Sequence, residues 1–476
     1  MSTLALAPHP AEATRPLTAR ERLEALCDPG SLQVIRTDVI SPAMGEKARA
    51  GDGVVGGAGT VDGRPVLCYA QDSSFAGGSL GEQHANTIVR VMELAERAKA
   101  PVVGFVASGG ARMQEGVAAL GGYGRIFHRI VQLSGRVPQI SIITGLSAGG
   151  GAYSPALTDW TVMTEDSSMF LTGPAVVRDA LGENVTAAEL GGTRVHERNG
   201  VCHFVSPSDV DAAFLSRELL GYLPSNRSSA PPVMPSRPAT GRDPAAAVPR
   251  EARRVYDVRD VIGALVDGGD FLEVSGGWAR NIVTGLARID GRTVGVIANQ
   301  PKHLGGVLDA DSSQKGARFV SKCNAFGIPL LVLVDTPGYM PGTRQESAGV
   351  IRFGATLVHA FAEATVPRVT VILRKAFGGA FITMNSKDLG ADFVFAWPSA
   401  QIGVMGARPA VGIIHRRELA AADDPDAARE RLAAEYEDAQ LRPEVAASTG
   451  YVDELIAPGQ TRARLQAAFQ TLRGNA

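Results

Sequence analysis

Cysteine is scarce in this sequence, and neither sign of charge accumulates anywhere in it. The cysteines form no C-x-x-C pair, so the sequence indicates neither a zinc ribbon nor a disulfide framework; they are Cys27, Cys68, Cys202 and Cys323. Basic and acidic residues almost balance, 47 against 49, which argues against a nucleic-acid-binding surface or a polybasic membrane patch. We expect neither of these partners, and no metal site.

Long apolar runs are also missing. No run approaches the roughly 18 residues that a transmembrane helix needs. The first residues, MSTLALAPHP, lack the basic start and the long apolar core of a secretory signal peptide. Together with the scattered cysteines, which suit a reducing compartment, these absences predict a cytoplasmic protein.

Glycine, by contrast, is abundant, and its positions reveal an internal repeat. The 55 glycines make up about 12% of the chain, against a usual value of roughly 7%. The sequence VDGR at 61–64 returns as IDGR at 289–292, an offset of 228 residues. Residues 23–32 resemble 262–271 at an offset of 239, which predicts about 11 extra residues within 40–55 of the first half. The chain therefore has the pattern of a duplicated domain.

The two copies are separated by a segment rich in proline. Residues 224–250 contain seven prolines and little apolar periodicity, which predicts an extended linker. The expected organisation is a disordered amino-terminus at 1–16, a first domain at 17–238 that runs into this linker, and a second domain at 251–476.

Short β-type runs alternate with helical stretches in each copy, which predicts an α/β fold with glycine-rich segments at strand-to-helix turns. In the expected helix 83–100, Ile88, Val91, Met92 and Ala95 form an apolar stripe that should pack in the core. The expected strands are 102–107, 139–144, 329–334 and 368–373.

The glycine-rich turns suggest a site built from backbone groups. With an offset of 228, AGGGA at 148–152 falls on AFGGA at 376–380. The first N–H groups of a helix have no intrahelical acceptor and can hold a negative oxygen. Glycine costs roughly 0.5 to 1 kcal/mol in ordered structure, whereas a donor aimed at a developing oxyanion is worth about 2.7 to 4 kcal/mol. A tight turn with close packing explains one copy equally well, but the recurrence favours two oxyanion sites.

A set of longer motifs covers almost the whole chain. They are SGGARMQEG (108–116), PQISIITGLSAGGGAYSPALTD (138–159), FLTGPAVV (170–177), LGGTRVH (190–196), YDVRDVI (256–262), GIPLLVLVDTPGYMPGTRQE (327–346), TVPRVTVILRKAFGGAFITMNSK (365–387) and AWPSAQIGVMGA (396–407). In these motifs and their order the chain resembles the carboxyltransferase (β) subunit of biotin-dependent acyl-CoA carboxylases, of the acetyl-CoA and propionyl-CoA carboxylase type.

This resemblance implies two tandem crotonase-like domains, each a spiral of ββα units. The amino-terminal domain would bind acyl-CoA, and the carboxy-terminal domain of a second subunit would bind carboxybiotin, within a homohexamer. Biotin would be carried by a separate biotinylated α subunit, because the chain contains neither a biotin-carrier lysine motif nor an ATP-grasp region.

The resemblance also implies roles for individual residues. The N–H groups of Gly149 and Gly150 would hold the thioester enolate oxygen, and those of Gly379 and Ala380, next to Gly378, the ureido oxygen of biotin. A second wall of the acyl-CoA site would be formed by Gly109, Gly110 and Ala111.

Two further positions concern specificity and departure from the family pattern. Ile382 matches a position that lines the acyl pocket in related carboxylases, where propionyl-type members often carry an acidic residue. One methylene in an apolar pocket discriminates by only about 1 to 3 kcal/mol, so we expect mixed use of acetyl-CoA and propionyl-CoA. Arg344 replaces a more usual acidic residue and could alter a salt bridge or a subunit contact.

The sequence contains no clear general base. None of the eight histidines falls in a triad pattern. In the implied reaction, biotin that has released CO2 can itself remove the α-proton, so no side-chain base is obligatory. Ser147 lies in a G-x-S-x-G pattern typical of hydrolases, but the repeat places Lys375 at the same position, so its hydroxyl is not shared by the two copies.

The expected reaction is transfer of CO2 from carboxybiotin to the α-carbon of acetyl-CoA or propionyl-CoA, giving malonyl-CoA or methylmalonyl-CoA. Three alternatives remain at this point. They are a biotin-dependent malonyl-CoA or methylmalonyl-CoA decarboxylase subunit, a crotonase-type hydratase or isomerase, and a catalytically inactive scaffold homologue.

Overall fold

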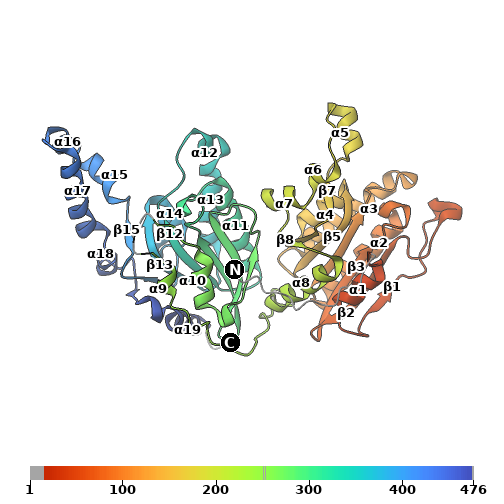
Figure 1. Cartoon of the computed structure of the whole chain (residues 1–476). Coiled ribbons are helices and arrows are strands. Elements are labelled where there is room, and N and C mark those ends of the chain that lie inside the picture. Colours follow the sequence, from red (N-terminus) through yellow and green to blue (C-terminus); the bar gives the residue numbers. More distant parts are fainter. Residues whose placement is uncertain (1–15, 250, 252–253, 474–476) are drawn as a thin grey trace. The chain divides into compact units, whose positions relative to one another are not determined.

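The computed structural model describes residues 16–249, 251 and 254–473, and the chain divides between Pro232 and Val233 into two compact units (Figure 1). The expected disordered segment 1–16 lies outside the described residues except for Pro16. Within the proline-rich segment, Met234 donates its N–H to the carbonyl of Gly291 at 2.9 Å, which ties the middle of the segment to unit 2.

Unit 1 contains an eight-stranded sheet in the order β1-β2-β3-β4-β5-β6-β8, with β7 paired to β5. The strands are β1 (Gln33–Ile35), β2 (Val54–Val61), β3 (Arg64–Gln71), β4 (Val102–Ser108), β5 (Gln139–Ala148), β6 (Trp160–Thr164), β7 (Ser168–Phe170) and β8 (Phe204–Ser206). The strands from β3 to β8 are parallel, whereas β1, β2 and β3 pair antiparallel.

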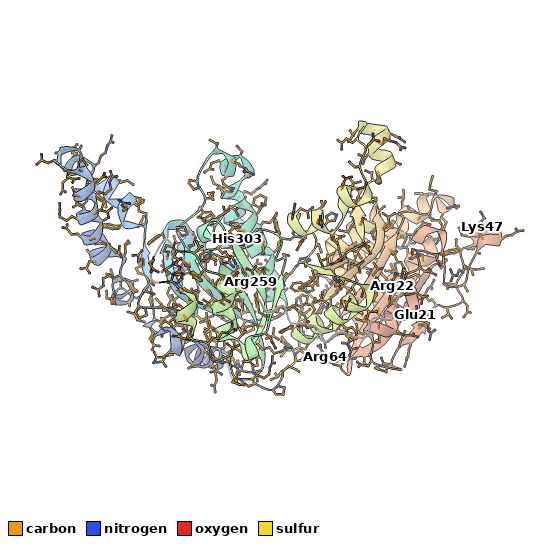
Figure 2. All side chains as sticks on the ribbon, in the orientation of Figure 1. Glu21, Arg22, Lys47, Arg64, Arg259 and His303 are labelled. Carbon is orange, nitrogen blue, oxygen red and sulfur yellow. The ribbon has the colours of Figure 1, made fainter. Side chains whose placement is uncertain are left out.

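The helices of unit 1 are α1 (Ala19–Leu26), α2 (Glu82–Ala98), α3 (Val117–Leu133), α4 (Gly150–Leu157), α5 (Pro174–Leu181), α6 (Ala187–Gly191), α7 (Thr193–Asn199) and α8 (Asp209–Tyr222). Helix α2 packs against α3 and the β2–β3 hairpin, and its predicted stripe of Ile88, Val91, Met92 and Ala95 is buried there. Arg22 of α1, which is labelled in Figure 2, pairs with Asp209 of α8 at 2.7 Å and so joins these two helices.

Unit 2 contains a second eight-stranded sheet in the order β9-β10-β11-β12-β13-β14-β16, with β15 paired to β13. The strands are β9 (Phe271–Val274), β10 (Ile282–Ile289), β11 (Arg292–Asn299), β12 (Leu330–Thr336), β13 (Arg368–Phe377), β14 (Phe393–Ala396), β15 (Gln401–Gly403) and β16 (Glu454–Leu455). The helices are α9 (Pro244–Ala247), α10 (Val258–Leu265), α11 (Ala310–Ala325), α12 (Thr343–Ala348), α13 (Val350–Glu363), α14 (Gly378–Thr383), α15 (Ala407–Ile414), α16 (Arg416–Ala421), α17 (Pro425–Tyr436), α18 (Pro443–Ser448) and α19 (Thr461–Leu472).

The two sheets have the same topology, which confirms the predicted α/β fold and its duplication. Each sheet begins with three antiparallel strands, continues with parallel strands, and carries one short strand paired to its fifth. The VDGR and IDGR motifs form equivalent hairpins, with φ +49° at Asp62 and +56° at Asp290. An aspartate earlier in each unit accepts two backbone N–H groups of the hairpin turn and pairs with an arginine. These pairs are Asp28 with Arg217 at 2.8 Å and Asp267 with Arg462 at 2.6 Å.

The extra residues of the first half form a loop before β2. Arg36 and Ser275 share a left-handed backbone, φ +56° and +55°, at the start of the loops that lead to β2 and β10. The loop in unit 1 is longer and includes a 3-10 helix, η1 (Pro42–Lys47). Lys47 lies on this loop, away from the sheet (Figure 2). The insertion therefore lies in the part of the first half where the sequence predicted it.

The repeat offset increases by one residue at the fifth strand. Val102 pairs with Gln139 in unit 1, and the equivalent Leu330 pairs with Arg368 in unit 2. Gln139 therefore corresponds to Arg368 at an offset of 229 residues. Both strands also extend further toward their carboxyl ends than expected, to Ala148 and to Phe377.

This shift corrects the predicted match at the glycine-rich turns. The match of 148–152 with 376–380 is wrong by one residue, and so is the match of Ser147 with Lys375. Ser147 pairs with Ser108 in unit 1, whereas Ala376 pairs with Thr336 at the same place in unit 2. Serine is therefore still not shared by the two copies.

Two general expectations concern the whole chain. Among the described residues, no helix is both long and apolar enough to cross a membrane. All four cysteines carry free thiols and are buried.

Candidate active site at two equivalent strand-to-helix turns

A tight turn follows β4 at the carboxyl end of the sheet in unit 1. Gly110 has φ +97°, and its N–H donates to the hydroxyl of Ser108 at 3.3 Å. The carbonyl of Gly110 accepts the N–H of Leu80 at 2.8 Å, and Ala111 forms an isolated parallel β-bridge with Leu80. Gly109 donates its N–H to the carbonyl of Gly77 at 3.0 Å, so that N–H is already engaged. The main chain of this turn is therefore fixed on both sides.

Unit 2 repeats this turn after β12 with the same bonds. Gly338 has φ +136°, and its N–H donates to the hydroxyl of Thr336 at 3.3 Å. The carbonyl of Gly338 accepts the N–H of Leu308 at 3.0 Å, and Tyr339 forms an isolated parallel β-bridge with Leu308. The repetition of this hydrogen-bond pattern in a different sequence indicates that both copies preserve the turn.

The second turn of unit 1 joins β5 to α4. Gly149 has φ +58°, and its N–H donates to the carbonyl of Phe170 at 3.1 Å. Gly150 is the first residue of α4, so its N–H has no intrahelical acceptor. The phenol of Tyr123 accepts the N–H of Gly151, and burial raises the pKa of Tyr123 to about 12. Of the three glycines, Gly150 is the one whose N–H has no acceptor among the described residues.

The equivalent turn of unit 2 joins β13 to α14. Gly378 has φ +59°, so it corresponds to Gly149, and Gly379 corresponds to Gly150. Gly379 and Ala380 lie in the first turn of α14, and Ala380 is buried. The positive end of a helix dipole and unpaired N–H groups coincide at such a position.

The three glycines of unit 1 have packing reasons that the sequence did not reveal. Gly149 needs its left-handed φ, a Cβ on Gly150 would lie 2.5 Å from the ring of Tyr123, and one on Gly151 would lie 3.1 Å from the Cβ of Ser108. Close packing, the alternative explanation of a single copy, is therefore present at this turn. Gly379 is different, because a Cβ there would meet no atom within 4 Å and its φ is not left-handed.

In each unit the two turns lie at the carboxyl ends of adjacent parallel strands. Ser108 at the end of β4 pairs with Ser147 in β5, and Thr336 at the end of β12 pairs with Ala376 in β13. A Cβ on Gly110 would lie 3.6 Å from the carbonyl oxygen of Ala148. Ligands of α/β proteins bind at this edge of a parallel sheet. The structure thus brings Gly109, Gly110 and Ala111 beside Gly149 and Gly150.

Ser147 has none of the geometry of a nucleophile. It lies inside β5 and is fully buried, and its Oγ has no hydrogen-bond partner among the described residues. A nucleophile elbow holds its serine on the strained residue of the turn, whereas the left-handed residue here is Gly149. The serine therefore packs in the strand.

A buried ion cluster fixes the loop that follows Gly110. Arg112 has no solvent exposure and donates to Asp52 at 2.5 Å and to Glu115 at 2.8 Å. Glu115 also accepts the N–H of Glu82 at the start of α2. Burial raises the pKa of Asp52 even though Arg112 opposes that shift. Burial and then the charge of Arg112 lower the pKa of the neighbouring His84 to about 3.

Unit 2 fixes its turn with a different buried pair. Asp335, the residue before Thr336, accepts Nε of Arg374 and the hydroxyl of Tyr256, both at 3.0 Å. Its other oxygen accepts the N–H of Lys375 at 3.2 Å. Burial raises the pKa of Asp335. This carboxylate therefore joins the ends of β12 and β13 just before the two turns.

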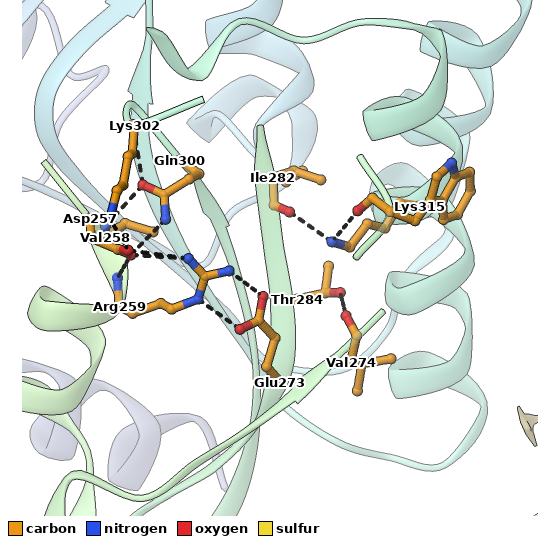
Figure 3. Close-up of polar contacts among 11 residues, drawn as sticks. Asp257, Val258, Arg259, Glu273, Val274, Ile282, Thr284, Gln300, Lys302 and Lys315 are labelled. Atoms are coloured by element: carbon orange, nitrogen blue, oxygen red, sulfur yellow. Dashed lines mark hydrogen bonds and ion pairs between the residues drawn. The ribbon is translucent and has the colours of Figure 1, made fainter. Parts of the chain in front are cut away.

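A second polar group of unit 2 lies near β9 and β10 and has a structural role. Lys315 is buried, and its Nζ donates to the carbonyls of Trp278 and Ile282, both at 2.9 Å (Figure 3). Burial lowers the pKa of Lys315 to about 7. Arg259 pairs with Glu273 at 2.6 Å in the same region (Figure 3). The YDVRDVI motif thus supplies an arginine that stabilises the edge of the sheet through its ion pair with Glu273.

Sequence reasoning did not predict these buried charged residues, because charged residues usually occupy solvent-exposed positions. Arg112, Asp335 and Arg374 lie inside the quoted motifs, and their location beside the glycine turns was the available signal. Ile382 follows Gly379 on α14 and is exposed. Arg344 lies on α12, and nothing in the described part of the chain explains its replacement of an acidic residue.

The chain matches a family model described as the carboxyl transferase domain, over residues 12–476. It is 50% identical to the propionyl-CoA carboxylase beta chain of Saccharopolyspora erythraea, with 96% of this chain and 87% of that protein covered. It is 48% identical to the methylmalonyl-CoA carboxyltransferase 12S subunit of Propionibacterium freudenreichii subsp. shermanii, with 95% and 88% covered.

The comparison with a solved structure agrees with these sequence relationships. A transcarboxylase 12S crystal structure, a hexamer with methylmalonyl-coenzyme A and methylmalonic acid bound, superposes with a TM-score of 0.92. Its sequence is 46% identical, and the match covers 97% of this chain and 91% of that one. The two crotonase-like domains predicted from the sequence are thereby confirmed.

Proposed function

The chain belongs to the carboxyl transferase domain family, and from this premise we propose that it is the carboxyltransferase subunit of an acyl-CoA carboxylase. The reaction transfers CO2 from biotin on a partner subunit to the α-carbon of propionyl-CoA, and also of acetyl-CoA. The observation that carries the proposal is the repeated turn, in which Gly150 and Gly379 present an N–H at the same place of two equivalent sheets.

On the acyl-CoA side, unit 1 holds the oxygen that becomes negative when the thioester forms its enolate. Gly150 donates to this oxygen, while Gly149 sets the backbone conformation and gives its own N–H to Phe170. This refines the expected pair, Gly149 and Gly150, to one donor at this turn. The turn of Gly109, Gly110 and Ala111 forms the adjacent wall. A donor of this kind lowers an enolate barrier by about 2.7 to 4 kcal/mol.

On the biotin side, the residues of unit 2 fit a flat ureido group. The space beside Gly379 is open, and a Cβ would be the first atom to fill it. Gly378 supplies the left-handed turn, and Gly379 and Ala380 donate to the ureido oxygen. When bound, biotin brings the carboxyl group and, after CO2 has left, a basic ureido nitrogen for the α-proton. Positioning and charge stabilisation are then the work of the protein.

The names of the relatives support propionyl-CoA and acetyl-CoA as the proposed substrates. Two of them are named for propionyl-CoA and methylmalonyl-CoA, and a third, from Mycobacterium tuberculosis, is a biotin-dependent acetyl-/propionyl-coenzyme A carboxylase beta5 subunit that is 47% identical over 96% of this chain. Ile382 presents an apolar side chain three residues after Gly379. We assign it to the acyl pocket of a second copy, where an apolar wall suits both the acetyl and the propionyl group.

The assembly proposal has two parts. The chain forms a homohexamer, as the 12S structure does. Its biotin arrives on a separate biotinylated α subunit, which also carries the biotin carboxylase activity.

Reconstitution tests the function. The purified chain is mixed with the biotinylated α subunit, ATP and bicarbonate, and the products from acetyl-CoA and propionyl-CoA are quantified by mass spectrometry. We expect methylmalonyl-CoA and malonyl-CoA. Formation of neither product, with the α subunit shown to carboxylate its own biotin, would refute the proposal.

A further inference from the structure

Each unit exposes two large apolar side chains beside its glycine turn, at equivalent positions. In unit 1 they are Tyr153, 52% exposed, and Leu171, 56% exposed. In unit 2 they are Ile382, 51% exposed, and Val404, 74% exposed. Tyr153 and Ile382 each follow the donor glycine by three residues, and Leu171 and Val404 each follow the short strand paired to the fifth strand.

This recurrence matters because the sequences around the two turns otherwise differ. Residues three apart lie on one face of a helix, so Tyr153 lies on the same face of α4 as the donor Gly150. Packing within the chain does not account for the pair, since half or more of each side chain is exposed. Apolar walls beside both turns are therefore features of the site.

In unit 1 a cavity opens behind these walls. It has a volume of about 330 Å³ and is lined mainly by apolar residues: Ala152, Tyr153, Ala156, Phe170, Leu171 and Leu190. Phe170 connects it to the turn, because its carbonyl accepts the N–H of Gly149. His196 also lines the cavity, but its Nε2 donates to the carbonyl of Met169 at 2.6 Å. A polar ligand therefore finds little to bind here.

The size and lining of the cavity indicate the class of ligand. Ligand pockets usually measure roughly 300 to 1,000 Å³ and are mostly apolar, whereas a propionyl group adds only one methyl group to an acetyl group. Ala152 and Ala156 leave room along α4, where larger residues would close the cavity. The cavity is thus larger than short acyl groups require and lies beside the donor that holds the thioester.

We propose that this cavity binds the alkyl chain of acyl-CoA thioesters longer than propionyl-CoA, which pass Tyr153 and Leu171 to enter it. The inference rests on the proposed function, since it places the thioester at Gly150. It extends the substrate range of the enzyme to medium-chain acyl-CoA and makes Ala156 a residue that determines specificity.

Isothermal titration calorimetry on the full-length chain tests this inference with CoA, propionyl-CoA and hexanoyl-CoA. Burial of a methylene strengthens binding about fourfold, so three additional methylenes predict a Kd about 60-fold lower for hexanoyl-CoA than for propionyl-CoA. Apolar burial also makes the heat capacity change of binding more negative for hexanoyl-CoA.

A pair of variants on α4 provides the control. Ala156 lines the cavity and Leu157 does not, and both side chains are exposed, so substitution leaves the core intact. In Ala156→Phe the ratio of the two Kd values should fall below about fivefold, since the ring fills the cavity. In Leu157→Phe the ratio should remain that of the unsubstituted chain. Thermal unfolding of both variants confirms that they are folded.

The outcomes separate this inference from the proposed function. Binding of propionyl-CoA with a Kd ratio near one would overturn the cavity assignment. A high ratio that survives Ala156→Phe would overturn it as well. Failure of every CoA compound to bind would instead count against the proposed function.

Discussion

Gly149 and Gly378 hold the same left-handed backbone conformation, with φ +58° and +59°, at the carboxyl ends of β5 and β13. This equivalence places Gly150 and Gly379, the proposed donors, at matching positions, although their surroundings differ. The ring of Tyr123 covers Gly150, whereas the space beside Gly379 is open. Duplication preserved the backbone, whereas the side chains around the two turns diverged.

Replacement of Ser147 tests the hydrolase alternative. Its hydroxyl is buried without a partner among the described residues, so Ser147→Ala removes an unsatisfied polar group and no interaction with a ligand. We expect the carboxyl transfer rate to stay within twofold of the original, and the stability to be unchanged or higher by about 1 kcal/mol. A loss of activity of 100-fold or more in the folded variant would show that the serine takes part in the chemistry.

Arg112 is predicted to hold the turn of Gly110 in place. In Arg112→Met, Asp52 and Glu115 remain buried without their cation, and breaking a buried pair usually costs about 3 to 5 kcal/mol. Urea unfolding should show this loss, together with weaker propionyl-CoA binding. The matched control is Arg20→Met, because Arg20 pairs with Glu24 on the surface and such pairs contribute about 1 kcal/mol or less. Equal stability of the two variants would contradict the prediction.

His84 gives unit 1 a specific pH dependence. Its pKa is about 3 in the folded chain and about 6.5 in the unfolded chain. The unfolded state alone takes up the proton between these values, so the contribution to stability is complete above pH 6.5 and falls as the pH decreases toward 3. Between pH 8 and pH 5 the free energy of unfolding should fall by about 2 kcal/mol on this account.

The His84→Gln variant isolates this effect, because the other histidines remain. Urea unfolding of both proteins at pH 8 and pH 5 gives the two differences in stability. The variant should lose about 2 kcal/mol less than the original between these pH values. Identical pH dependence of the two proteins would show that His84 is solvated or protonated in the folded state.

Much of the fold could be predicted because the sequence repeats its local patterns. The VDGR and IDGR hairpins, the strand starts at residues 102, 139 and 368, and the buried stripe of α2 all follow from local turn chemistry and periodicity. Local signals do not depend on distant contacts, so they survive in a single sequence.

The offset at the glycine turns could not be predicted in the same way. The sequences AGGGA and AFGGA match in four positions at the offset of 228 and in fewer at 229. The pairing of Leu330 with Arg368 and the left-handed φ of Gly378 decide for 229. Both are properties of the folded sheet. Where several glycines stand together, counting identical residues can give the wrong offset between the two copies.

The donor assignment also depends on long-range contacts. The N–H of Gly149 is engaged because β7 brings Phe170 beside β5. The buried charges of Arg112 and Asp52 are 60 residues apart in the sequence. Neither pairing leaves a local pattern, so sequence reasoning could propose the two glycine turns as the site but could not identify which of their amides are already engaged.

Gly379→Ala tests the central claim most directly, namely that the backbone at the two turns carries the chemistry. A Cβ at this position meets no neighbouring atom of the described residues within 4 Å, and alanine is favoured over glycine in a helix by up to about 1 kcal/mol. The variant should therefore be as stable as the original or more so. Gly412→Ala, in α15, is the control, since its Cβ also meets no atom within 4 Å.

The measurement is the rate of carboxyl transfer in the reconstituted enzyme, compared for Gly379→Ala, Gly412→Ala and the unsubstituted chain. Because a methyl group beside the donors displaces the ureido oxygen, and a displacement of about 1 Å can cost 100-fold in rate, we predict a loss of at least 100-fold for Gly379→Ala only. Full activity of a folded Gly379→Ala enzyme would contradict the account.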